Sequence, residues 1–204
     1  MVMPDAETDG WTDASLIYRA AKFGDRAAFG QLILRHQGLV RAQLRRLTGG
    51  DHAWADDLAQ HAFLQAWRKL EEFRGESRFS TWLFRVSYTT FLQESRRRKS
   101  ATELEFSETS AARDDCELQT LRIDLETALG RLSDGERAAL VHCYHLDLSH
   151  EETAEILGIP VGTVKSHVAR GKAKLRALLS DWNVGRVRSA PRDQRNGPLG
   201  GKHD

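Results

Sequence analysis

The stretch 73–99 interleaves aromatic rings with cations, and its chemistry can be interpreted more directly than that of any other segment. It contains a polar loop, 74–80, and ends in four consecutive cations. Cations attract phosphate groups, and ring faces stack on unpaired bases, which is worth about 1–3 kcal/mol per base. The stretch is therefore typical of a surface that binds a nucleic-acid strand. We assign that role to the basic cluster and to Phe79, Trp82 and Tyr88.

Other side chains of this stretch are expected to pack in a core. Leu83, Phe84 and Val86 lie on one broad apolar stripe, and apolar residues at helical spacing usually face the interior of a protein. Gly75 breaks the chain before them. Ser80 is placed to cap a helix that continues without Gly or Pro to the end of the stretch.

A second set of residues, between His150 and Arg170, meets the geometric needs of a helix-turn-helix. Ala154 leaves room for a crossing helix, Gly158 suits a sharp turn, and Ile159 fills the angle between the two helices. The second helix of this motif lies in the major groove of DNA, and residues near its start face the bases. The side chains expected there are Thr163, Lys165, Ser166, His167, Ala169 and Arg170, with Lys172 continuing the basic side. Whether Lys165 and Arg170 read guanine edges or hold phosphates stays open.

An all-helical fold is expected, because no proline occurs between residues 5 and 159 and strand-like alternation is scarce. Asp25 follows a glycine and is predicted to cap the second helix. The third helix has a buried face of alanines and large apolar residues, and Asp57, Gln60, His61 and Gln65 lie on its polar side. The expected helices cover residues 13 or 15 to 23, 26–47, 54–73, 81–99, 121–131 and 134–145, followed by two short helices before residue 182.

Composition divides the chain into two small helical domains, 13–99 and 121–182. Between them, residues 100–120 carry acidic side chains against a single arginine, which is the composition of a flexible linker that cannot bury a core. Residues 183–204, rich in Gly, Pro and Arg, are expected to form a disordered basic tail. The 204-residue chain has a net charge of only +1, so attraction to nucleic acid must come from local clusters of charge.

The sequence argues against several other classes of protein. The first ten residues hold no apolar segment typical of a signal peptide, and no run is long enough to span a bilayer. We therefore expect a cytoplasmic protein without membrane insertion. Cys116 and Cys143 have no metal-binding spacing, and we expect no metal, cofactor or disulfide. The acidic residues fall in first turns of helices or in the linker, and no Ser or Tyr occupies a Gly-rich catalytic turn, so an enzyme is not expected.

Two segments together resemble the sigma-70 family of bacterial RNA polymerase sigma factors. The nearest resemblance is to its compact extracytoplasmic-function class, which keeps only regions two and four. The segments read DDLAQHAFLQAWRKLEEFRGESRFSTWLFRV and ETAEILGIPVGTVKSHVARGKAKLRALL. The resemblance covers about Asp13–Lys99 and Leu121–Trp182 and leaves the linker and both tails unmatched. Two motifs in this order are much more specific than either alone.

The resemblance implies three binding surfaces and their partners. The third helix would dock on the clamp coiled coil of the largest polymerase subunit. The loop and the helix after it would capture the -10 element with a flipped base in a pocket, and the helix-turn-helix would read the -35 element. It also implies a contact with the flap of the second subunit, a linker threaded through the polymerase, and an anti-sigma factor that could hold the protein at the membrane. The residues carried over are Asp57, Gln60, His61, Gln65 and Trp67 for the polymerase; Arg74, Arg78, Phe79, Trp82, Arg85, Tyr88, Thr89, Gln93, Arg96 and Arg97 for the -10 element; and Thr163, Lys165, Ser166, His167, Arg170 and Lys172 for the -35 element.

The chain departs from the family pattern at several of these positions. His61 stands where many relatives have a Glu, which suggests a hypothesis of pH-sensitive docking. Thr89 and Gln93 replace residues common in the family, so the -10 sequence preference stays open.

Two other functions are alternatives for a chain with a helix-turn-helix. A free-standing helix-turn-helix repressor or activator does not need the loop of aromatics and cations, and a DNA-processing enzyme requires a nucleophile or metal-binding carboxylates.

Overall fold

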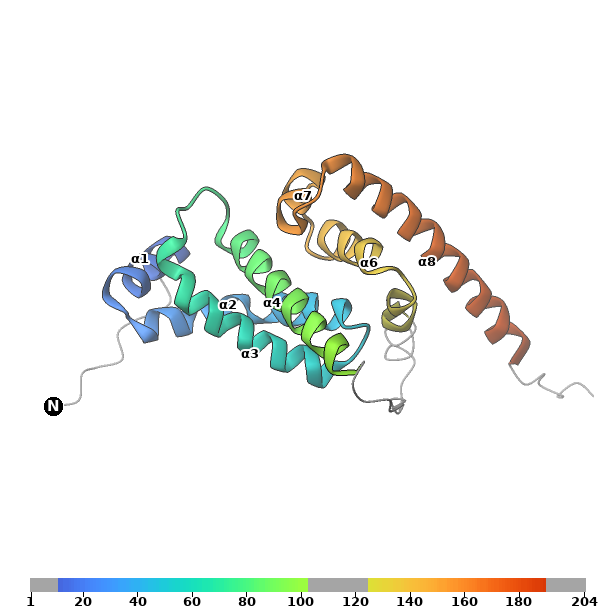
Figure 1. Ribbon diagram of the computed structural model, residues 1–204, viewed down its shortest axis with the longest axis horizontal. Coiled ribbons are helices and arrows are strands. Elements are labelled where there is room, and N and C mark those ends of the chain that lie inside the picture. Colours follow the sequence, from blue (N-terminus) through green and yellow to red (C-terminus); the bar gives the residue numbers. More distant parts are fainter. Residues whose placement is uncertain (1–10, 103–124, 190–204) are drawn as a thin grey trace, which may run out of the picture.

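The computed structural model describes residues 11–102 and 125–189, and every regular element within these two ranges is a helix (Figure 1). The predicted all-helical fold is therefore confirmed. Residues 125–130 form a short helical segment that precedes α6. The named elements are α1 (Asp13–Phe23), α2 (Arg26–Leu47), α3 (His52–Lys69), the 3-10 turn η2 (Leu70–Glu72), α4 (Phe79–Thr102), α6 (Asp134–Leu140), the π-helical turn η3 (Val141–His145), α7 (His150–Leu157) and α8 (Val161–Ser189).

Side-chain caps set the starts of the first helices. Asp25 accepts hydrogen bonds from the backbone N–H groups of Ala27 and Ala28, both at 3.0 Å, which confirms its predicted role at the start of α2. Gly24, before it, closes α1 at a φ of 63°, a left-handed conformation that costs glycine little. The cap of α1 is Thr12, so this helix begins at Asp13 as one of the two predicted starts.

Two helix boundaries differ from prediction for identifiable reasons. The third helix begins at His52 instead of residue 54, because Asp51 accepts a hydrogen bond from the Trp54 N–H and so caps the helix earlier. Its last predicted turn is the 3-10 turn η2. The fourth helix begins at Phe79, which places Ser80 inside the first turn and rules it out as the cap.

The C-terminal ends of two helices extend beyond the predicted domain limits. α4 continues to Thr102, into the first residues of the predicted linker, and the rest of that linker lies outside the described residues. α7 is short as expected, but α8 is 29 residues long and runs to Ser189, so the expectation of a second short helix is wrong. The disorder expected from residue 183 is wrong for residues 183–189, and residues 190–204 lie outside the described part of the chain. Gly185 lies within this helix at a cost of about 1 kcal/mol relative to Ala, and no proline occurs between Val161 and Pro191.

The first helical domain packs α2, α3 and α4 side by side, with α1 at one end (Figure 1). Leu32, Val40, Leu44 and Leu47 of α2 are almost completely buried between the other helices. Leu39 is 46% exposed, because it is offset by one position from the Val40–Leu44–Leu47 stripe.

The second helical domain has a smaller core formed by α6, α7, α8 and the segment before α6. Its buried residues are Leu129, Leu132, Ala139, Leu140, Ala154, Val164 and Val168. The two domains are in contact: Ala138, Val141, Leu148 and Ile156 of the second domain belong to the same buried cluster as the core of the first. Figure 1 shows α7 above α4, with α8 leading away from the pair. Among the described helices, none combines the length and apolar character needed to cross a membrane.

Candidate nucleic-acid and polymerase interface

The helix-turn-helix has the geometry that the sequence predicts. Ser149 and Glu152 form a reciprocal capping box at the start of α7. Gly158 adopts a left-handed φ of 67° at the turn, and Val164 of α8 is fully buried against the first helix of the motif. The Ile159 N–H donates to the Ala154 carbonyl at 3.2 Å, which closes the turn. α8 therefore has a fixed orientation relative to α7.

The predicted base-facing residues of α8 occupy different sides of the helix. Lys165, Ser166 and Arg170 are exposed, whereas Thr163, His167 and Lys172 are partly buried. A Cβ on Gly135 would lie 2.9 Å from the His167 ring, so this ring packs closely on the start of α6. The Lys172 ammonium is 3.0 Å from the Tyr144 hydroxyl and 4.8 Å from the centre of its ring. Lys172 is thus directed toward η3.

A buried carboxylate holds α8 against α6. Glu136 is the third residue of α6, its side chain is only 4% exposed, and the Lys174 ammonium contacts it at 2.8 Å. This hydrogen bond from Lys174 lowers the pKa of Glu136, and the N–H of Ser133 acts in the same direction, although burial opposes both. Arg170 lies 3.7 Å from the same carboxylate. The ion pairs fix the rotation of the recognition helix about its axis.

Exposed polar residues form a stripe along α4. Arg85, Thr89, Gln93 and Arg96 recur at three- and four-residue spacing and are all exposed, so they share one face of the helix. Thr89 donates its hydroxyl hydrogen to the Arg85 carbonyl at 2.9 Å. We call these four residues the α4 stripe. Its composition suits contacts with phosphates and base edges.

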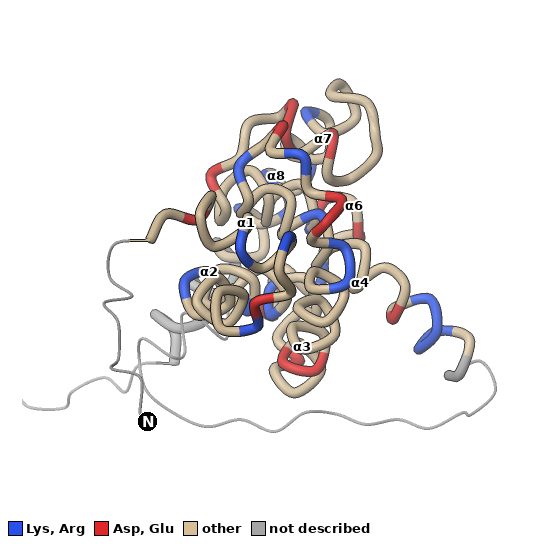
Figure 2. Tube along the Cα trace, turned by 90° about the vertical axis from the view of Figure 1, so that its left-hand side faces the viewer, with Lys and Arg blue, Asp and Glu red and all other residues tan. Residues whose placement is uncertain are grey.

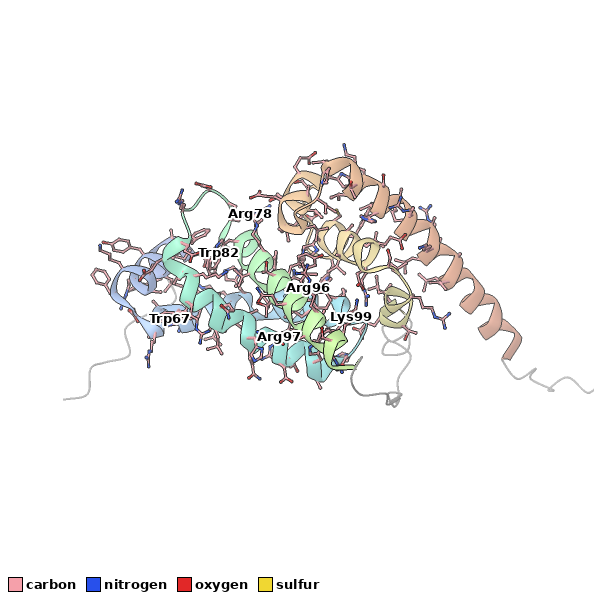
Figure 3. The ribbon with its side chains drawn as sticks, viewed as in Figure 1. Trp67, Arg78, Trp82, Arg96, Arg97 and Lys99 are labelled. Atoms are coloured by element: carbon pink, nitrogen blue, oxygen red, sulfur yellow. The ribbon has the colours of Figure 1, made fainter. Side chains whose placement is uncertain are left out.

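The C-terminal cations of α4 differ in their partners. Arg97 pairs with Glu94 at 3.0 Å, and Lys99 pairs with Asp134 of the second domain at 3.3 Å. Arg98 pairs with Asp51 at 3.1 Å and covers the Trp54 ring at 4.7 Å. Figure 3 shows Arg96, Arg97 and Lys99 along this end of the helix. Part of the predicted basic cluster is therefore engaged in ion pairs.

The aromatic residues of α4 are less exposed than the sequence suggested. Phe79 is 6% exposed and Tyr88 is 8% exposed, so the expectation that both present ring faces is wrong for this arrangement. Phe79 packs between Phe73 and His36, with ring centres 5.6 and 5.3 Å away. Tyr88 meets the edge of His142 across the domain boundary at 5.3 Å. A helical pattern identifies apolar faces but not which ring a neighbouring element covers.

A cleft of about 970 Å³ lies where the loop before α4 meets α1 and η2. Arg74, Ser77 and Arg78 line it from the loop, and Phe73 and Phe79 contribute rings. Trp82 is half-buried beside these rings, 5.5 Å from each of them, and Figure 3 shows it just inside the loop. The cleft thus combines cations with an aromatic wall.

Asp13 fixes the far side of this cleft. Burial favours a higher pKa for its carboxyl, but hydrogen bonds from Arg35 and His36, at 2.9 and 2.7 Å, outweigh burial and lower the pKa. The carboxylate therefore ties α1 to α2. This places α1 as a fixed wall opposite the loop.

The polar face of α3 contains one exposed apolar residue. Asp57, Gln60 and His61 are exposed as predicted, and Leu64 beside them is 56% exposed. Figure 2 shows acidic positions on α3 and basic positions on α4. Leu64 was not predicted as a surface residue, although its position four residues after Gln60 places it on the same polar face of the helix.

The last two predicted docking residues are less accessible. Gln65 is partly exposed, and Trp67 packs its ring on Phe29 with the ring centres 5.0 Å apart. Trp67 therefore contributes to the core of the first domain. Its position in Figure 3 is at the α1 end of α3.

The structure also contains an apolar groove of about 340 Å³ that was not predicted from the sequence. Cationic or titratable side chains at its margin are Arg46, His145 and Lys172. Its apolar lining is Leu125, Leu129, Leu140, Val141, Tyr144 and Leu175. The groove is assembled from segments distant in sequence, which no local pattern reveals.

These features define a two-domain helical DNA-binding protein, and comparison with known proteins identifies its family. The model for Sigma-70 region 2 matches residues 32–101, and the model for Sigma-70 region 4 matches residues 122–175. The chain belongs to the sigma-70 family of RNA polymerase sigma factors, in its extracytoplasmic-function class. It is a promoter-directing transcription initiation factor.

Individual relatives match over most of the chain. RNA polymerase sigma factor NccH from Alcaligenes xylosoxydans xylosoxydans is 34% identical over 87% of this chain and 100% of its own length. The ECF RNA polymerase sigma factor SigM from Mycobacterium tuberculosis is 36% identical over 85% of this chain and 88% of its own.

Two solved structures are similar in fold. RpoE from Bartonella quintana, crystallised with the anti-sigma factor NepR, is 30% identical, with a TM-score of 0.65 over 74% of this chain and 96% of that chain. CnrH in complex with the cytosolic domain of CnrY is 32% identical, with a TM-score of 0.62 over 83% of this chain and 97% of that chain.

Proposed function

We propose that the chain performs promoter recognition with three separate surfaces: α3 for the polymerase, the loop cleft with α4 for the -10 element, and α8 for the -35 element. The observation that carries this assignment is the α4 stripe, which runs along the helix that also closes the cleft. A simple duplex-binding protein with a helix-turn-helix needs no such surface. The chemistry is recognition and strand separation by binding, with no covalent step and no enzyme activity.

The polymerase-docking surface is the exposed side of α3. Asp57, Gln60 and His61 supply polar contacts, Gln65 lies at the margin, and Leu64 supplies the apolar centre that protein interfaces typically contain. The partner is the clamp coiled coil of the largest polymerase subunit. Trp67 supports this surface from inside by packing on Phe29.

The -10 element binds at the loop cleft and the α4 stripe. Arg74 and Arg78 lie in the cleft lining, where they attract phosphates of the non-template strand. The cleft volume of about 970 Å³ is large enough to accept a flipped base, and Phe73 and Trp82 lie close enough to stack with bases. Extruding a base costs a few kcal/mol of stacking, which the contacts with Arg85, Thr89, Gln93, Arg96 and Arg97 offset.

The -35 element binds to the exposed side of α8. Lys165, Ser166 and Arg170 enter the major groove first, with Thr163 and His167 at the margin. Lys172 acts from its position beside Tyr144, near the apolar groove. We assign that groove to the flap of the second polymerase subunit, because its lining of leucines and Val141 gives a partner segment an apolar surface.

An anti-sigma factor controls the protein. Both similar structures are complexes with regulators of this kind or with the cytosolic domain of a named partner. By analogy, a regulator of this chain competes with the polymerase for the exposed surfaces of the two domains. The functional units are residues 13–99 and 121–182, connected by residues 100–120.

Copurification with core RNA polymerase distinguishes this function from that of a free-standing repressor or activator. The chain should bind core polymerase without DNA, and the complex should survive gel filtration. A chain that binds duplex DNA by itself but never binds the polymerase would contradict the proposal and support the repressor.

A further inference from the structure

The cleft before α4 has a second wall, on α1, that the proposed function does not use. The residues of α1 that line it recur at three- and four-residue spacing, so they share one face of the helix: Ala14, Ile17, Tyr18, Ala21 and Lys22. We call these residues the α1 stripe, which is about 12 Å long at a rise of about 1.5 Å per residue. Figure 1 shows α1 beside the end of α3 that leads into the loop.

Tyr18 is the large side chain that the α1 stripe leaves exposed. It lies in the middle of the helix, yet it is 61% exposed. The Phe23 ring meets it edge to face, with ring centres 5.7 Å apart and an angle of 84° between the planes. An edge-to-face contact covers at most one face of a ring, so another face of Tyr18 is available to a planar group. Proteins that bind single strands stack bases on rings of this kind.

The charges in the cleft favour an anionic ligand. Lys22, Arg74 and Glu71 line the cleft and form no ion pair with any residue in the described ranges. The other acid of the lining, Asp13, is neutralised by Arg35 at 2.9 Å. Two cations therefore face one acid. A third cation of the lining, Arg78, shares its charge with Glu152 at 3.5 Å and adds to the attraction only in part.

The two walls of the cleft are connected by direct contacts. The Asp13 carboxylate of α1 is 2.7 Å from Nε2 of His36, and the centre of the His36 ring is 5.3 Å from that of Phe79 at the start of α4. All three residues line the cleft. The α1 stripe is thus held opposite the loop before any ligand binds, which reduces the entropy that binding must cost.

The cleft is larger than a single flipped base requires. Its volume of about 970 Å³ lies at the upper end of the range of about 300–1,000 Å³ that is typical of sites for whole drug-sized ligands. A base alone is smaller than such a ligand. The cleft can therefore hold the flipped base beside Phe73 and a neighbouring nucleotide beside α1.

We propose that the α1 stripe binds the unpaired nucleotide that follows the -10 element on its 3′ side. The base stacks on the Tyr18 ring, and Lys22 binds a phosphate from its position one helical turn further along. The 3′ side is the relevant one, because the strands separate from the -10 element toward the start point and only unpaired bases expose a ring face. The inference rests on the proposed binding of the -10 strand at this cleft.

The test uses the chain bound to core RNA polymerase and two single-stranded oligonucleotides from a mapped promoter. One ends at the last base of the -10 element, and the other continues for three nucleotides on the 3′ side. Contacts of the polymerase with the added nucleotides are the same for every variant. The ratio of the two affinities therefore isolates the contribution of α1.

Tyr18→Ala should weaken binding of the longer oligonucleotide at least about fivefold, as expected for loss of one stacked base, and should leave binding of the shorter one unchanged. Tyr18→Phe keeps the ring and should bind both like the unmodified chain. Leu34→Ala is the matched control, because it removes an apolar side chain that is 63% exposed on α2 and lies outside the cleft lining. It should change neither affinity.

Lys22→Gln tests the phosphate contact. For the longer oligonucleotide, this variant should reduce the slope of log affinity against log salt concentration by about 0.7, the value for one phosphate of a single strand. Lys69→Gln removes another exposed lysine, on α3 and outside the cleft lining, and should leave the slope unchanged. Equal slopes for the two variants would show that Lys22 binds no phosphate.

Fluorescence reports the stacking itself. 2-Aminopurine at the first added position loses fluorescence when it stacks, so its signal in the complex should rise in Tyr18→Ala and stay low in Tyr18→Phe. An unchanged signal in Tyr18→Ala, or equal weakening of both oligonucleotides, would overturn the proposal. Weaker binding of Tyr18→Ala to core polymerase would also overturn it, because the ring would then belong to a protein interface. If the unmodified complex fails to bind the shorter oligonucleotide, the -10 assignment of the cleft is wrong and the role of α1 fails with it.

Discussion

The Gln43 side-chain amide donates a hydrogen bond to Nε2 of His142, 2.9 Å away, across the boundary between the two domains. The other ring nitrogen of His142, Nδ1, donates to the Ala138 carbonyl at 2.7 Å. A carbonyl only accepts, so Nδ1 carries the hydrogen and Nε2 must be the acceptor. The contact therefore requires a neutral His142, because protonated Nε2 would point an N–H at the amide donor.

This contact predicts that the folded protein, in which the two domains are in contact, loses stability in mild acid. Burial lowers the pKa of His142 to about 4 from 6.5, although the hydrogen bond to Ala138 acts in the opposite direction. An exposed His142 takes up a proton below about pH 6.5, whereas the buried one resists protonation until about pH 4. The contribution of neutral His142 to the free energy of unfolding is therefore complete above pH 6.5 and is lost as the pH falls from 6.5 toward 4. The loss has a limit of about 3 kcal/mol.

Chemical denaturation at pH 7.5 and pH 5 measures this effect. The free energy of unfolding of the unmodified protein should fall by about 2 kcal/mol more than that of His142→Gln. His145→Gln is measured in parallel, because burial and the neighbouring Arg46 also lower the pKa of His145. This variant gives the share of the pH dependence that comes from His145. Identical pH dependence of the unmodified protein and His142→Gln would contradict the account.

Replacing Lys165 and Arg170 together with Ala should remove recognition of the -35 element. Specific contacts to base edges contribute about 1–3 kcal/mol each, so the affinity for a -35 duplex should fall at least tenfold. Fluorescence anisotropy with a labelled duplex measures the affinity. Binding to core polymerase should be unchanged, and its loss in this variant would argue against the assignment of α8.

Phe79 and Trp82 should respond differently to replacement by Ala. Phe79 is buried among aromatic rings, so Phe79→Ala should lower the free energy of unfolding by about 3–5 kcal/mol. Trp82→Ala should instead slow promoter opening more than it weakens the closed complex, which permanganate footprinting can follow. Equal losses in both steps for Trp82→Ala would indicate that Trp82 only supports the core.

Leu64→Ser should weaken docking on core polymerase by about tenfold, as expected for loss of an apolar interface centre. The matched control is Leu34→Ser on α2, since Leu34 is 63% exposed and Leu64 is 56% exposed. Both variants should keep the stability of the unmodified chain within about 0.5 kcal/mol. A similar loss of polymerase binding in both would mean that exposed apolar area in general, and not the α3 surface, drives the association.

Local chemistry made much of the fold predictable. The Asp25 cap, the turn at Gly158 and the packing of Val164 depend on residues within a few positions of one another, so their geometry follows from sequence spacing. The extension of α8 was missed because Gly and Arg composition suggested disorder, although the first proline that stops a helix comes only at Pro191.

Long-range packing was not predictable from local patterns. Tyr88 is covered by His142, and Phe79 by Phe73 and His36, so their burial depends on elements elsewhere in the chain. The contact of α7 with α4, which brings together Arg85 and Glu155, has the same origin. The sequence correctly indicated a polar face on α3, but its exposed leucine became evident only in the structure.

Transcription in vitro with purified core RNA polymerase tests the central claim most directly. The chain should direct polymerase that lacks any other sigma factor to start at defined positions on a set of genomic fragments, and the starts should share upstream sequences at -10 and -35. Random initiation or no transcript, with the chain folded and no inhibitor present, would contradict the account.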